Sequence, residues 1–539
     1  MMPPKFALLL SLGLECLLVA CGPTQQAAPQ DTRPAADTPK KGGVLNTVGD
    51  DFSDFDLVYQ GKTIENVRDH GLVYDTLLRF KRGPGAEYVS QILQPSLAEK
   101  WEVSADARTF TYHLRKGVKF ADVTPVNGRE LTSADVKWSM EYYSRTGEFA
   151  DKKYAASQMQ PQYESLQGID TPDKYTVQVR FKEPFAPFMN YSASQWMPIA
   201  AKETFKADEN LPRIATLVGT GPYIYDLANS QKDSRFVFKK NPTYWGTPPY
   251  LDGIRRLVVP DESTRVAAFA TKQTDIIAPA TYKVAAGVKQ ANPQAMLAES
   301  LDPYAWTMFT SQKRGGALAD IRVRRAISLA MDRNEFNQVV SGGKGAWALT
   351  GSWPGLFTDT EAREMLKYDP EQAKKLLAEA GYGNGLKLEY LLVATDQVTD
   401  ELFQAQVKRV GIDAQFQILP REQNRAKLYV GDYDVTRIGA SGGDADFDAR
   451  LFSFYGAASQ NWAVIQDTEL DKLILAQRRE GDPQKRRDVQ RAVVKRLTEM
   501  AWSPAYAFPV KTMLWHPYVK NYGPHFTVGE DDAFVWLDK

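Results

Sequence analysis

The sequence has almost none of the side chains that most often bind metals or attack substrates. It contains two cysteines, Cys16 and Cys21, and four histidines in 539 residues. Because both cysteines lie within the first 21 residues, the rest of the chain has no disulfide, no cysteine-ligated zinc site and no thiol nucleophile. The HExxH sequence and a histidine pair at ligand spacing are also absent. We therefore expect no metal site and no cofactor.

An excess of charge of one sign is missing as well. Lys and Arg number 66 and Asp and Glu number 66, so the formal net charge is zero. Without a global field there is nothing to favour nucleic acid or an anionic membrane surface. A Walker A sequence is absent, so any ATP hydrolysis has to belong to a partner protein. No period of 20–50 residues repeats, which excludes a solenoid or a propeller.

What remains has an ordinary globular composition. Apolar residues make up 43% and charged residues 24% of the chain. At about 150 residues per domain, the length predicts three or four domains. Aromatic residues reach 11%, with 11 Trp and 25 Tyr, and such rings line many small-molecule clefts as well as cores.

The first residues predict an export signal. Lys5 precedes a 15-residue apolar run, 6–20, which contains Glu15. As a helix this run would span about 22 Å, short of the ~30 Å hydrocarbon core of a membrane. The sequence LVACG at 18–22 resembles a bacterial lipobox, in which the chain is cut before a cysteine that is lipidated. We expect a lipoprotein signal peptide at 1–20, with Cys21 lipidated, although an incidental cysteine in an ordinary signal peptide stays open.

The residues that follow predict a flexible tether at 21–40. They contain Pro, Gln, Ala, Asp and Thr and no large apolar side chain. Such a segment buries too little surface to offset its ordering entropy. A lipid anchor followed by a tether suits a folded domain held beside a membrane.

The body of the chain alternates between strand-like and helix-like patterns. Residues 110–114 and 175–181 have the period of two that predicts half-buried strands. Residues 132–135, TSAD, predict a helix start with a capping box. A further helix is predicted from Asp369 and Pro370 to the glycine at Gly381. The strand–helix–strand pattern from about 385 to 440 predicts an α/β domain with a partly parallel sheet, where ligands bind beyond the strand carboxyl ends.

Three groups of segments together resemble a known family. The first is LAEKWEVSAD at 97–106, FTYHLRKGVKF at 110–120 and TSADV at 132–136. The second is GTGPY at 219–223, NPTYW at 241–245, YLDG at 250–253 and TDI at 274–276. The third is DIRVRRA at 320–326, AMDR at 330–333 and the helix ending at Gly381. In this order they resemble the extracytoplasmic solute-binding proteins of ABC importers, family 5, the class of the oligopeptide- and dipeptide-binding proteins.

The resemblance implies an α/β fold of the periplasmic-binding-protein type, with two lobes joined by a hinge and an extra inserted domain. Lobe I is expected at 41–78, 206–303 and 512–539. The inserted domain II is expected at 79–205, and lobe II, or domain III, at 304–511.

The resemblance also indicates which residues to examine in the cleft. In peptide-binding members an aspartate near a Gly-Trp pair meets the peptide α-ammonium. The matching stretch is 434–448, where Asp444 is the first candidate and Asp446 the second, and Ala440 replaces the tryptophan. Burying an ammonium requires a paired carboxylate. The alternative for both aspartates is that they cap the helix that begins near Phe447. The other candidates for ligand contact are Tyr59, Gln60, Trp196, Trp306, Trp353, Gly439, Ser441 and Trp462.

The expected function is that of a substrate-binding lipoprotein of an ABC import system. It would capture a short peptide or a similar small organic solute and deliver it to a permease dimer served by separate ATPase subunits, without catalysing a reaction. We expect an exported monomer, anchored by lipid at the outer face of the cytoplasmic membrane or in the periplasm, that binds no nucleic acid. Metal chelates, opines and sugars stay open as ligands, and so does a role as a sensor.

A lipid-anchored serine esterase is the alternative from another class of protein. The sequence GASGG at 439–443 matches the G-x-S-x-G pattern with Ser441 as nucleophile, after a predicted strand and before a predicted helix. His516 and His525 follow in the order that this class requires. No HGG-type oxyanion sequence is present, and the pattern has only three fixed positions, so we regard the transport function as the better interpretation.

Overall fold

A computed structural model provides the structure of the protein. It describes residues 38–49, 64–151, 157, 159–207, 212–214, 216–393, 397–438, 445–454, 456, 461–526 and 532–539. The residues from Lys40 to Lys539 form one compact unit. Within the described ranges, no helix combines the length and the apolarity needed to cross a bilayer. The predicted signal peptide, with Cys21, lies outside the described residues.

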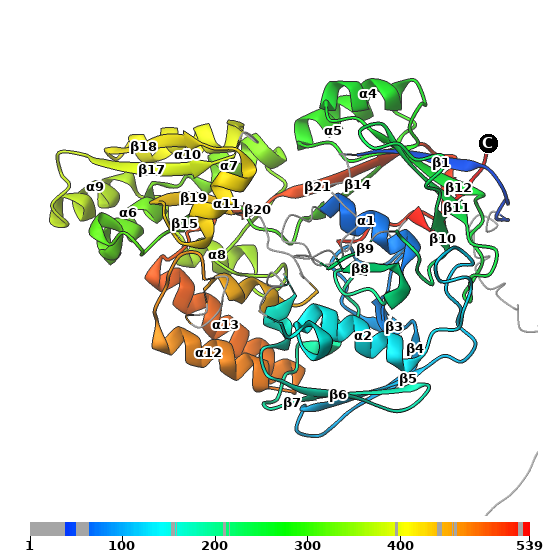
Figure 1. Cartoon of the computed structure of the whole chain (residues 1–539). Coiled ribbons are helices and arrows are strands. Elements are labelled where there is room, and N and C mark those ends of the chain that lie inside the picture. The colour runs from blue at the N-terminus through cyan, green and yellow to red at the C-terminus, as the bar shows by residue number, and fades with distance from the viewer. Residues whose placement is uncertain are drawn as a thin grey trace, which may run out of the picture. The chain divides into compact units, whose positions relative to one another are not determined.

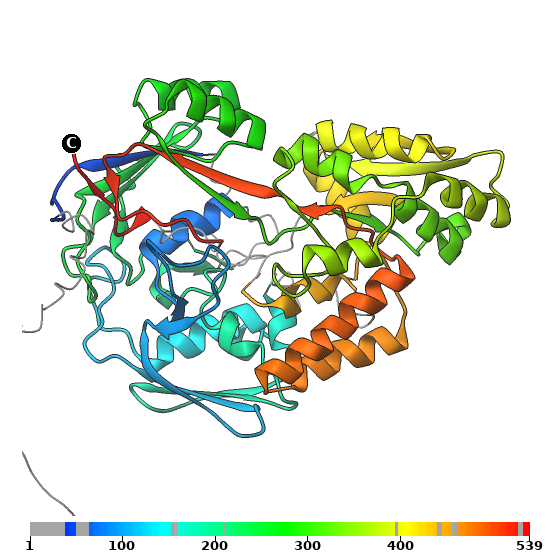
Figure 2. The same ribbon diagram turned by 180° about the vertical axis from the view of Figure 1, so that it is seen from behind.

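The first sheet draws its strands from the beginning, the middle and the end of the chain. Its order is β10 (Tyr223–Tyr225), β11 (Arg235–Lys240), β12 (Gly253–Val258), β1 (Val44–Gly49), β13 (Ile276–Ile277), β21 (Val510–Trp515) and β14 (Met296–Leu301). Strand β1 pairs in parallel with β12 and β13, and the other pairs are antiparallel. Helices α4 (Glu262–Ala270) and α5 (Tyr282–Ala291) lie on one side of this sheet and α1 (Ile64–Val73) on the other (Figures 1 and 2).

The second sheet is wholly antiparallel. Its order is β4 (Ala98–Val103), β5 (Thr109–Leu114), β7 (Thr176–Phe181) and β6 (Leu166–Asp173). The alternating burial of β5 and β7 confirms the two strands predicted from their period of two. Helix α2 (Ser133–Ser144) starts at the predicted capping box, because Asp135 accepts a hydrogen bond from the backbone N–H of Thr132 at 2.9 Å. The short helix α3 is Phe188–Tyr191.

The third sheet is mixed. Its order is β15 (Thr307–Thr310), β19 (Val435–Ile438), β17 (Leu386–Leu392) and β18 (Ile412–Ile418). Strand β17 pairs in parallel with both β18 and β19, which confirms the predicted partly parallel sheet. Alternate residues of β17 enter different clusters: Leu388 and Tyr390 pack with α6, α9 and α10, whereas Leu391 packs with α12 and α13. The helices of this region are α6 (Ile321–Ala330), α7 (Arg333–Ser341), α8 (Asp359–Met365), α9 (Pro370–Glu379), α10 (Gln397–Lys408), α11 (Arg421–Tyr429), α12 (Thr468–Arg479) and α13 (Pro483–Met500).

Local signals place helix α9 where the sequence predicts it. The side chain of Asp369 accepts a hydrogen bond from the backbone N–H of Gln372 at 2.9 Å, and Pro370 occupies the first turn. Gly381 has a φ of 92°, a left-handed conformation that glycine adopts without steric cost. The capped start and the glycine stop are both confirmed.

Short strand pairs and 3-10 turns complete the structure. The pairs are β2 (Leu78–Phe80) with β3 (Leu93–Pro95), β8 (Phe205–Ala207) with β9 (Pro212–Ile214), β16 (Ala346–Trp347) with β20 (Ala507–Phe508), and β22 (Val519–Lys520) with β23 (Trp536–Leu537). The 3-10 segments are η1 (Gly147–Phe149), η2 (Gln160–Tyr163), η3 (Lys202–Thr204), η4 (Gly316–Ala319) and η5 (Phe447–Ser453).

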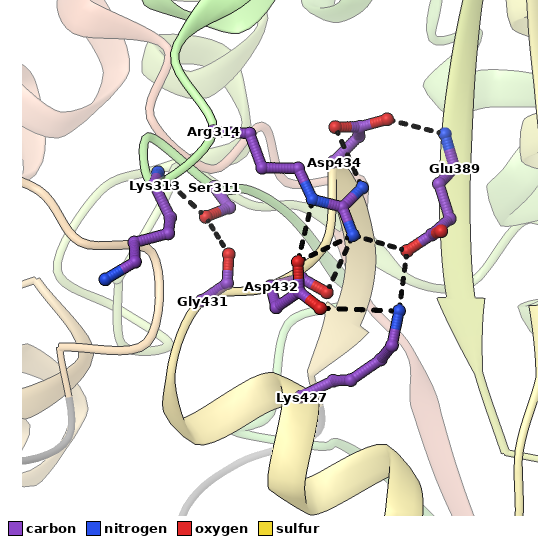
Figure 3. Close-up of polar contacts among 8 residues, drawn as sticks. All are labelled: Ser311, Lys313, Arg314, Glu389, Lys427, Gly431, Asp432 and Asp434. Carbon is purple, nitrogen blue, oxygen red and sulfur yellow. Dashed lines mark hydrogen bonds and ion pairs between the residues drawn. The ribbon is translucent and has the colours of Figure 1, made fainter.

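A charged cluster on the surface connects the end of β15, the start of β19 and the middle of β17. We call it the Arg314 cluster; its members are Arg314, Glu389, Lys427, Asp432 and Asp434 (Figure 3). Asp434 accepts a hydrogen bond from the backbone N–H of Glu389 at 2.8 Å, while its other oxygen faces the guanidinium of Arg314 at 3.4 Å. The cluster therefore holds β17 and β19 together beyond their shared ladder.

Candidate functional site

Two connections run side by side between the first and the third sheet. Residues 302–306 join β14 to β15, and residues 501–509 lead from α13 back to β21. The backbone N–H of Trp306 donates to the carbonyl of Ala507 at 3.1 Å, and the N–H of Tyr506 donates to the carbonyl of Trp306 at 2.8 Å. This two-stranded crossing, visible in Figure 2, is narrow compared with the sheets that it joins. It has the form of a hinge.

An arginine stacks between two rings next to this crossing. The guanidinium carbon of Arg450, in η5, lies 4.7 Å from the ring centroid of Trp353 and 5.1 Å from that of Tyr304. The ring of Trp353 also meets Phe526 edge to face at 5.4 Å. Trp353 packs against the cluster that contains the second sheet and against the cluster of α12 and α13. A predicted candidate, Trp353 therefore lies where the parts of the chain on either side of the crossing meet.

A carboxyl group with an altered pKa lies beside Tyr304. The side chain of Asp302 accepts a hydrogen bond from the backbone N–H of Tyr304 at 3.0 Å. Burial raises the pKa of Asp302 above its usual value, and the charges of Lys511 and Arg450 only partly oppose this shift. A perturbed carboxyl at a hinge is a candidate for function as well as for structure.

Buried ion pairs within the segment 304–511 are hydrogen-bonded to the segment 79–205. Asp448 is fully buried and accepts a hydrogen bond from Nε of Arg478 at 2.7 Å. It also accepts bonds from the hydroxyl of Tyr191 at 3.3 Å and from Gln477. Burial, with the nearby carboxylates, raises the pKa of Tyr191 well above its usual value, so its hydroxyl remains a donor. Burial opposes the charged form of Arg478, but Asp448, Tyr191 and Glu164 together outweigh it and raise the pKa of that guanidinium.

Asp446 belongs to the same contact. Its two oxygens face the guanidinium of Arg486 at 2.5 and 3.0 Å, and one of them accepts a hydrogen bond from Nδ2 of Asn190 at 2.8 Å. Asp446 is 2% exposed and caps η5 through the backbone N–H of Asp448. The carboxylate is thus already neutralised by an arginine and acts as the helix cap that the sequence left as the alternative. We call Asp446, Asp448, Arg478 and Arg486 the interface cluster.

The other predicted tryptophans that the structure describes lie in separate surroundings. Trp306 stacks under the guanidinium of Arg437 at 4.3 Å, on the third sheet. Trp462 is buried beside Tyr429, with ring centroids 5.8 Å apart, and belongs to the packing around α11. Trp196 is half-buried against the cluster that contains the second sheet. Of these rings, Trp306 is in the crossing itself.

Several predicted site residues lie outside the described residues: Tyr59, Gln60, Gly439, Ser441 and Asp444. The two histidines of the esterase alternative are described. Nε2 of His516 lies 3.1 Å from the carbonyl oxygen of Phe269, and Nε2 of His525 lies 2.9 Å from that of Ser90. Burial lowers the pKa of His516. Both rings are therefore engaged by backbone carbonyls. Among the described side chains, no group of three His, Cys, Asp or Glu residues forms a metal site.

Sequence reasoning missed Arg450, Tyr304 and Asp302. The only sequence signal was the position of Asp302, Pro303 and Tyr304 directly after a strand, since residues that follow strand ends gather at ligand sites in α/β folds. Arg450 gave no signal, because its two ring partners are distant from it in the chain.

Comparison with known proteins identifies the family. The model of the bacterial extracellular solute-binding proteins, family 5, matches residues 93–462. The chain belongs to this family. The dipeptide-binding protein of Escherichia coli K12 is 29% identical over 405 residues, which cover 71% of this chain and 73% of that protein. Heme-binding protein A of Haemophilus influenzae is 26% identical over 427 residues, which cover 75% of each.

Solved structures of family 5 proteins share the fold. DppA of Helicobacter pylori, in complex with the peptide STSA, superposes with a TM-score of 0.79 at 24% identity, covering 93% of this chain and 99% of that one. AgaA from Agrobacterium tumefaciens R10, in complex with agropinic acid, superposes with a TM-score of 0.77 at 25% identity. The match covers 92% of this chain and 99% of that one. The mixed α/β architecture is thus that of the bilobal periplasmic binding proteins.

Proposed function

We propose that this family 5 protein is the substrate-binding component of an ABC import system. It would hold a small organic solute between the segment 304–511 and the rest of the chain, and deliver it to a permease dimer. The observation that carries the proposal is the position of Trp353, with Arg450 stacked on it, against two hydrophobic clusters on either side of the narrow crossing. A solute held by both sides stabilises the closed form by contacts that the open form lacks.

A short peptide or a similar cationic solute is the proposed ligand class. Asp446 is paired with Arg486, which leaves Asp444 as the carboxylate that would meet a ligand ammonium. Relatives that are named for dipeptides, glutathione and di- or tripeptides support a peptide.

Asp444→Asn tests this ligand class by calorimetry with a panel of di- and tripeptides. Loss of a carboxylate that pairs with a buried ammonium weakens binding by about 2–5 kcal/mol. Asp413→Asn is the matched control, because Asp413 is an exposed carboxylate on β18, and its affinity should stay unchanged. Equal affinities for the two variants and the unmodified protein would remove Asp444 from the site.

A non-peptide solute is the second candidate. It is favoured by Ala440, which replaces the tryptophan of the peptide-binding pattern, and by relatives named for heme or solved with agropinic acid. A metal chelate, an opine or a sugar would then occupy the same place, and a sensory role would use the same closing movement. If calorimetric titration with peptides gives no heat of binding, and titration with one of these solutes gives a saturable heat, the second candidate is the better one.

We also propose that the protein is not an enzyme and that Cys21 anchors it to the membrane by lipid. The matched family is one of solute-binding proteins, and the relatives named above are binding proteins. Ester hydrolysis that disappears in Ser441→Ala would contradict the first statement. For the second, Cys21→Ser should move the protein from the membrane fraction to the soluble fraction of cells. A variant that remains in the membrane fraction would show that the cysteine is not the anchor.

A further inference from the structure

A large cavity lies away from the crossing. Its volume is about 950 Å³, within the range of small-molecule sites. None of the described residues that line it comes from the segment 304–511. It is lined by Arg79, Phe80, Arg82, Gly83, Pro84, Gln94, Pro95, Glu99, Arg115, Lys116, Val118, Tyr244, Trp245, Gly246, Thr247, Tyr250, Asn521 and Phe534. It is therefore separate from the place proposed for the transported solute.

The lining of this cavity is strongly basic. The lining contains four cationic side chains and one carboxylate. The cationic side chains are those of Arg79, Arg82, Arg115 and Lys116, and the carboxylate is that of Glu99. In the part of the chain that the structure describes, Arg79, Arg115 and Lys116 form no ion pair. The protein as a whole is electrically neutral, so this is a local concentration of positive charge. Like charges gathered in a hollow produce a field that attracts anions.

Aromatic rings complete the lining. The guanidinium carbon of Arg115 lies 5.2 Å from the ring centroid of Trp245, and Tyr244 lies 5.5 Å from Trp245, ring to ring. Trp245 is held in place, because its Nε1 donates to a carboxylate oxygen of Asp75 at 2.9 Å. Nε of Arg115 is held as well, by the carbonyl of Ser96 at 2.8 Å. A fixed ring next to a fixed cation is suited to a ligand that combines a flat body with negative charge.

We propose that this basic cavity binds a small organic anion with two or more negative groups on a flat ring. The negative groups would pair with Arg79, Arg115 and Lys116, and the ring would lie against Tyr244 and Trp245. Because the described lining contains no residue of the segment 304–511, occupancy does not require closure around the transported solute. The site would thus be a second one, independent of the proposed function.

Fluorescence titration with 8-hydroxypyrene-1,3,6-trisulfonate, a flat trianion, tests the site on the full-length protein. Arg79→Glu combined with Lys116→Glu should weaken binding by about tenfold or more, because two attractions become repulsions. Lys81→Glu is the matched control: Lys81 is exposed, lies outside the lining, and should change the affinity by less than about twofold. Lys116 is exposed, so Lys116→Glu alone keeps the fold and should weaken binding by about threefold.

A second probe separates charge from ring. Citrate, a trianion without a ring, should bind at least about fivefold more weakly than the pyrene probe, because stacking adds to the charge attraction. Unchanged pyrene binding in both Lys116 variants, or no binding by the unmodified protein, would overturn the site. Equal affinity for citrate and the pyrene probe would overturn the role of the rings.

Discussion

The interface cluster and the Arg314 cluster use the same chemistry in opposite surroundings. In the interface cluster, the side chains of Asp448 and Arg478 are 0% and 7% exposed. In the Arg314 cluster, those of Arg314 and Asp432 are 33% and 48% exposed (Figure 3). In both, guanidinium groups face carboxylates at hydrogen-bond distance.

The two clusters differ in how far solvent screens their charges. Around Arg314, water and salt screen the charges, so the loss of one partner is largely compensated by solvent. Around Asp448, no solvent replaces a lost partner, and the guanidinium of Arg478 stays buried with only the half-exposed Glu164, 3.6 Å away, as a facing carboxylate in its ion pairs. Distance alone therefore does not rank ion pairs. The carboxylates of the interface cluster accept hydrogen bonds from Asn190 and Tyr191, more than 250 positions away in the chain, and so tie the segments 79–205 and 304–511 together.

The largest predicted effect comes from breaking the buried pair. Asp448→Ala leaves Arg478 charged and buried, and should destabilise the protein by about 3–5 kcal/mol. Urea unfolding followed by tryptophan fluorescence measures this. Asp413→Ala, at an exposed carboxylate, should change the stability by less than about 0.5 kcal/mol. If Asp448→Ala lowers the free energy of unfolding as little as Asp413→Ala does, the buried pair does not stabilise the fold more than an exposed carboxylate.

An intermediate effect is predicted at Asp302, where burial is not matched by a close cation. Its raised pKa means that the folded protein binds more protons than the unfolded chain between the usual value of 3.8 and the raised value. Stability from this group is therefore present at low pH and is lost as the pH rises through the raised pKa. Asp302→Asn removes the cost of ionising this buried carboxyl group. The substitution should raise the melting temperature at pH 7 but leave it unchanged near about pH 3.

Thermal melts at both pH values check this direction of the pH dependence. The amide oxygen of the variant can still accept the hydrogen bond from Tyr304, so the comparison isolates the charge of Asp302. A variant that melts lower than the unmodified protein at pH 7, or one whose gain is the same at both pH values, would contradict the assignment.

The smallest effect is predicted for the exposed cluster. Arg314→Ala should cost about 1 kcal/mol or less, and the difference should shrink as salt is raised to about 1 M. The loss in Asp448→Ala should persist at the same salt concentration. If salt changes the stability loss of Arg314→Ala and of Asp448→Ala by the same amount, burial does not explain the difference between the two clusters.

The sequence was sufficient for elements whose cause is local. The period of two in 110–114, the capping box at Thr132 and the capped helix from Asp369 are each determined by neighbours within a few residues, and all three are confirmed. The family followed from ordered segments across the chain, and the matched model confirms it.

The site was only partly predictable. Trp353 stays a predicted ligand contact, whereas for Asp446 the structure shows the helix cap that was the alternative. The pairing of Asp446 with Arg486 and Asn190 depends on tertiary packing, and no local pattern encodes a partner 256 residues away. The stacking of Arg450 between Trp353 and Tyr304 has the same origin.

Native mass spectrometry tests the central claim most directly. The protein would be incubated with an equimolar pool of di- and tripeptides, metal chelates, opines and sugars, and its spectrum compared with that of Asp444→Asn. The account predicts one non-covalent adduct per chain, with the mass of an unaltered member of the pool, and a weaker adduct in the variant if the member is cationic. Absence of any adduct, or shortened or hydrolysed solutes in the filtrate, would contradict it.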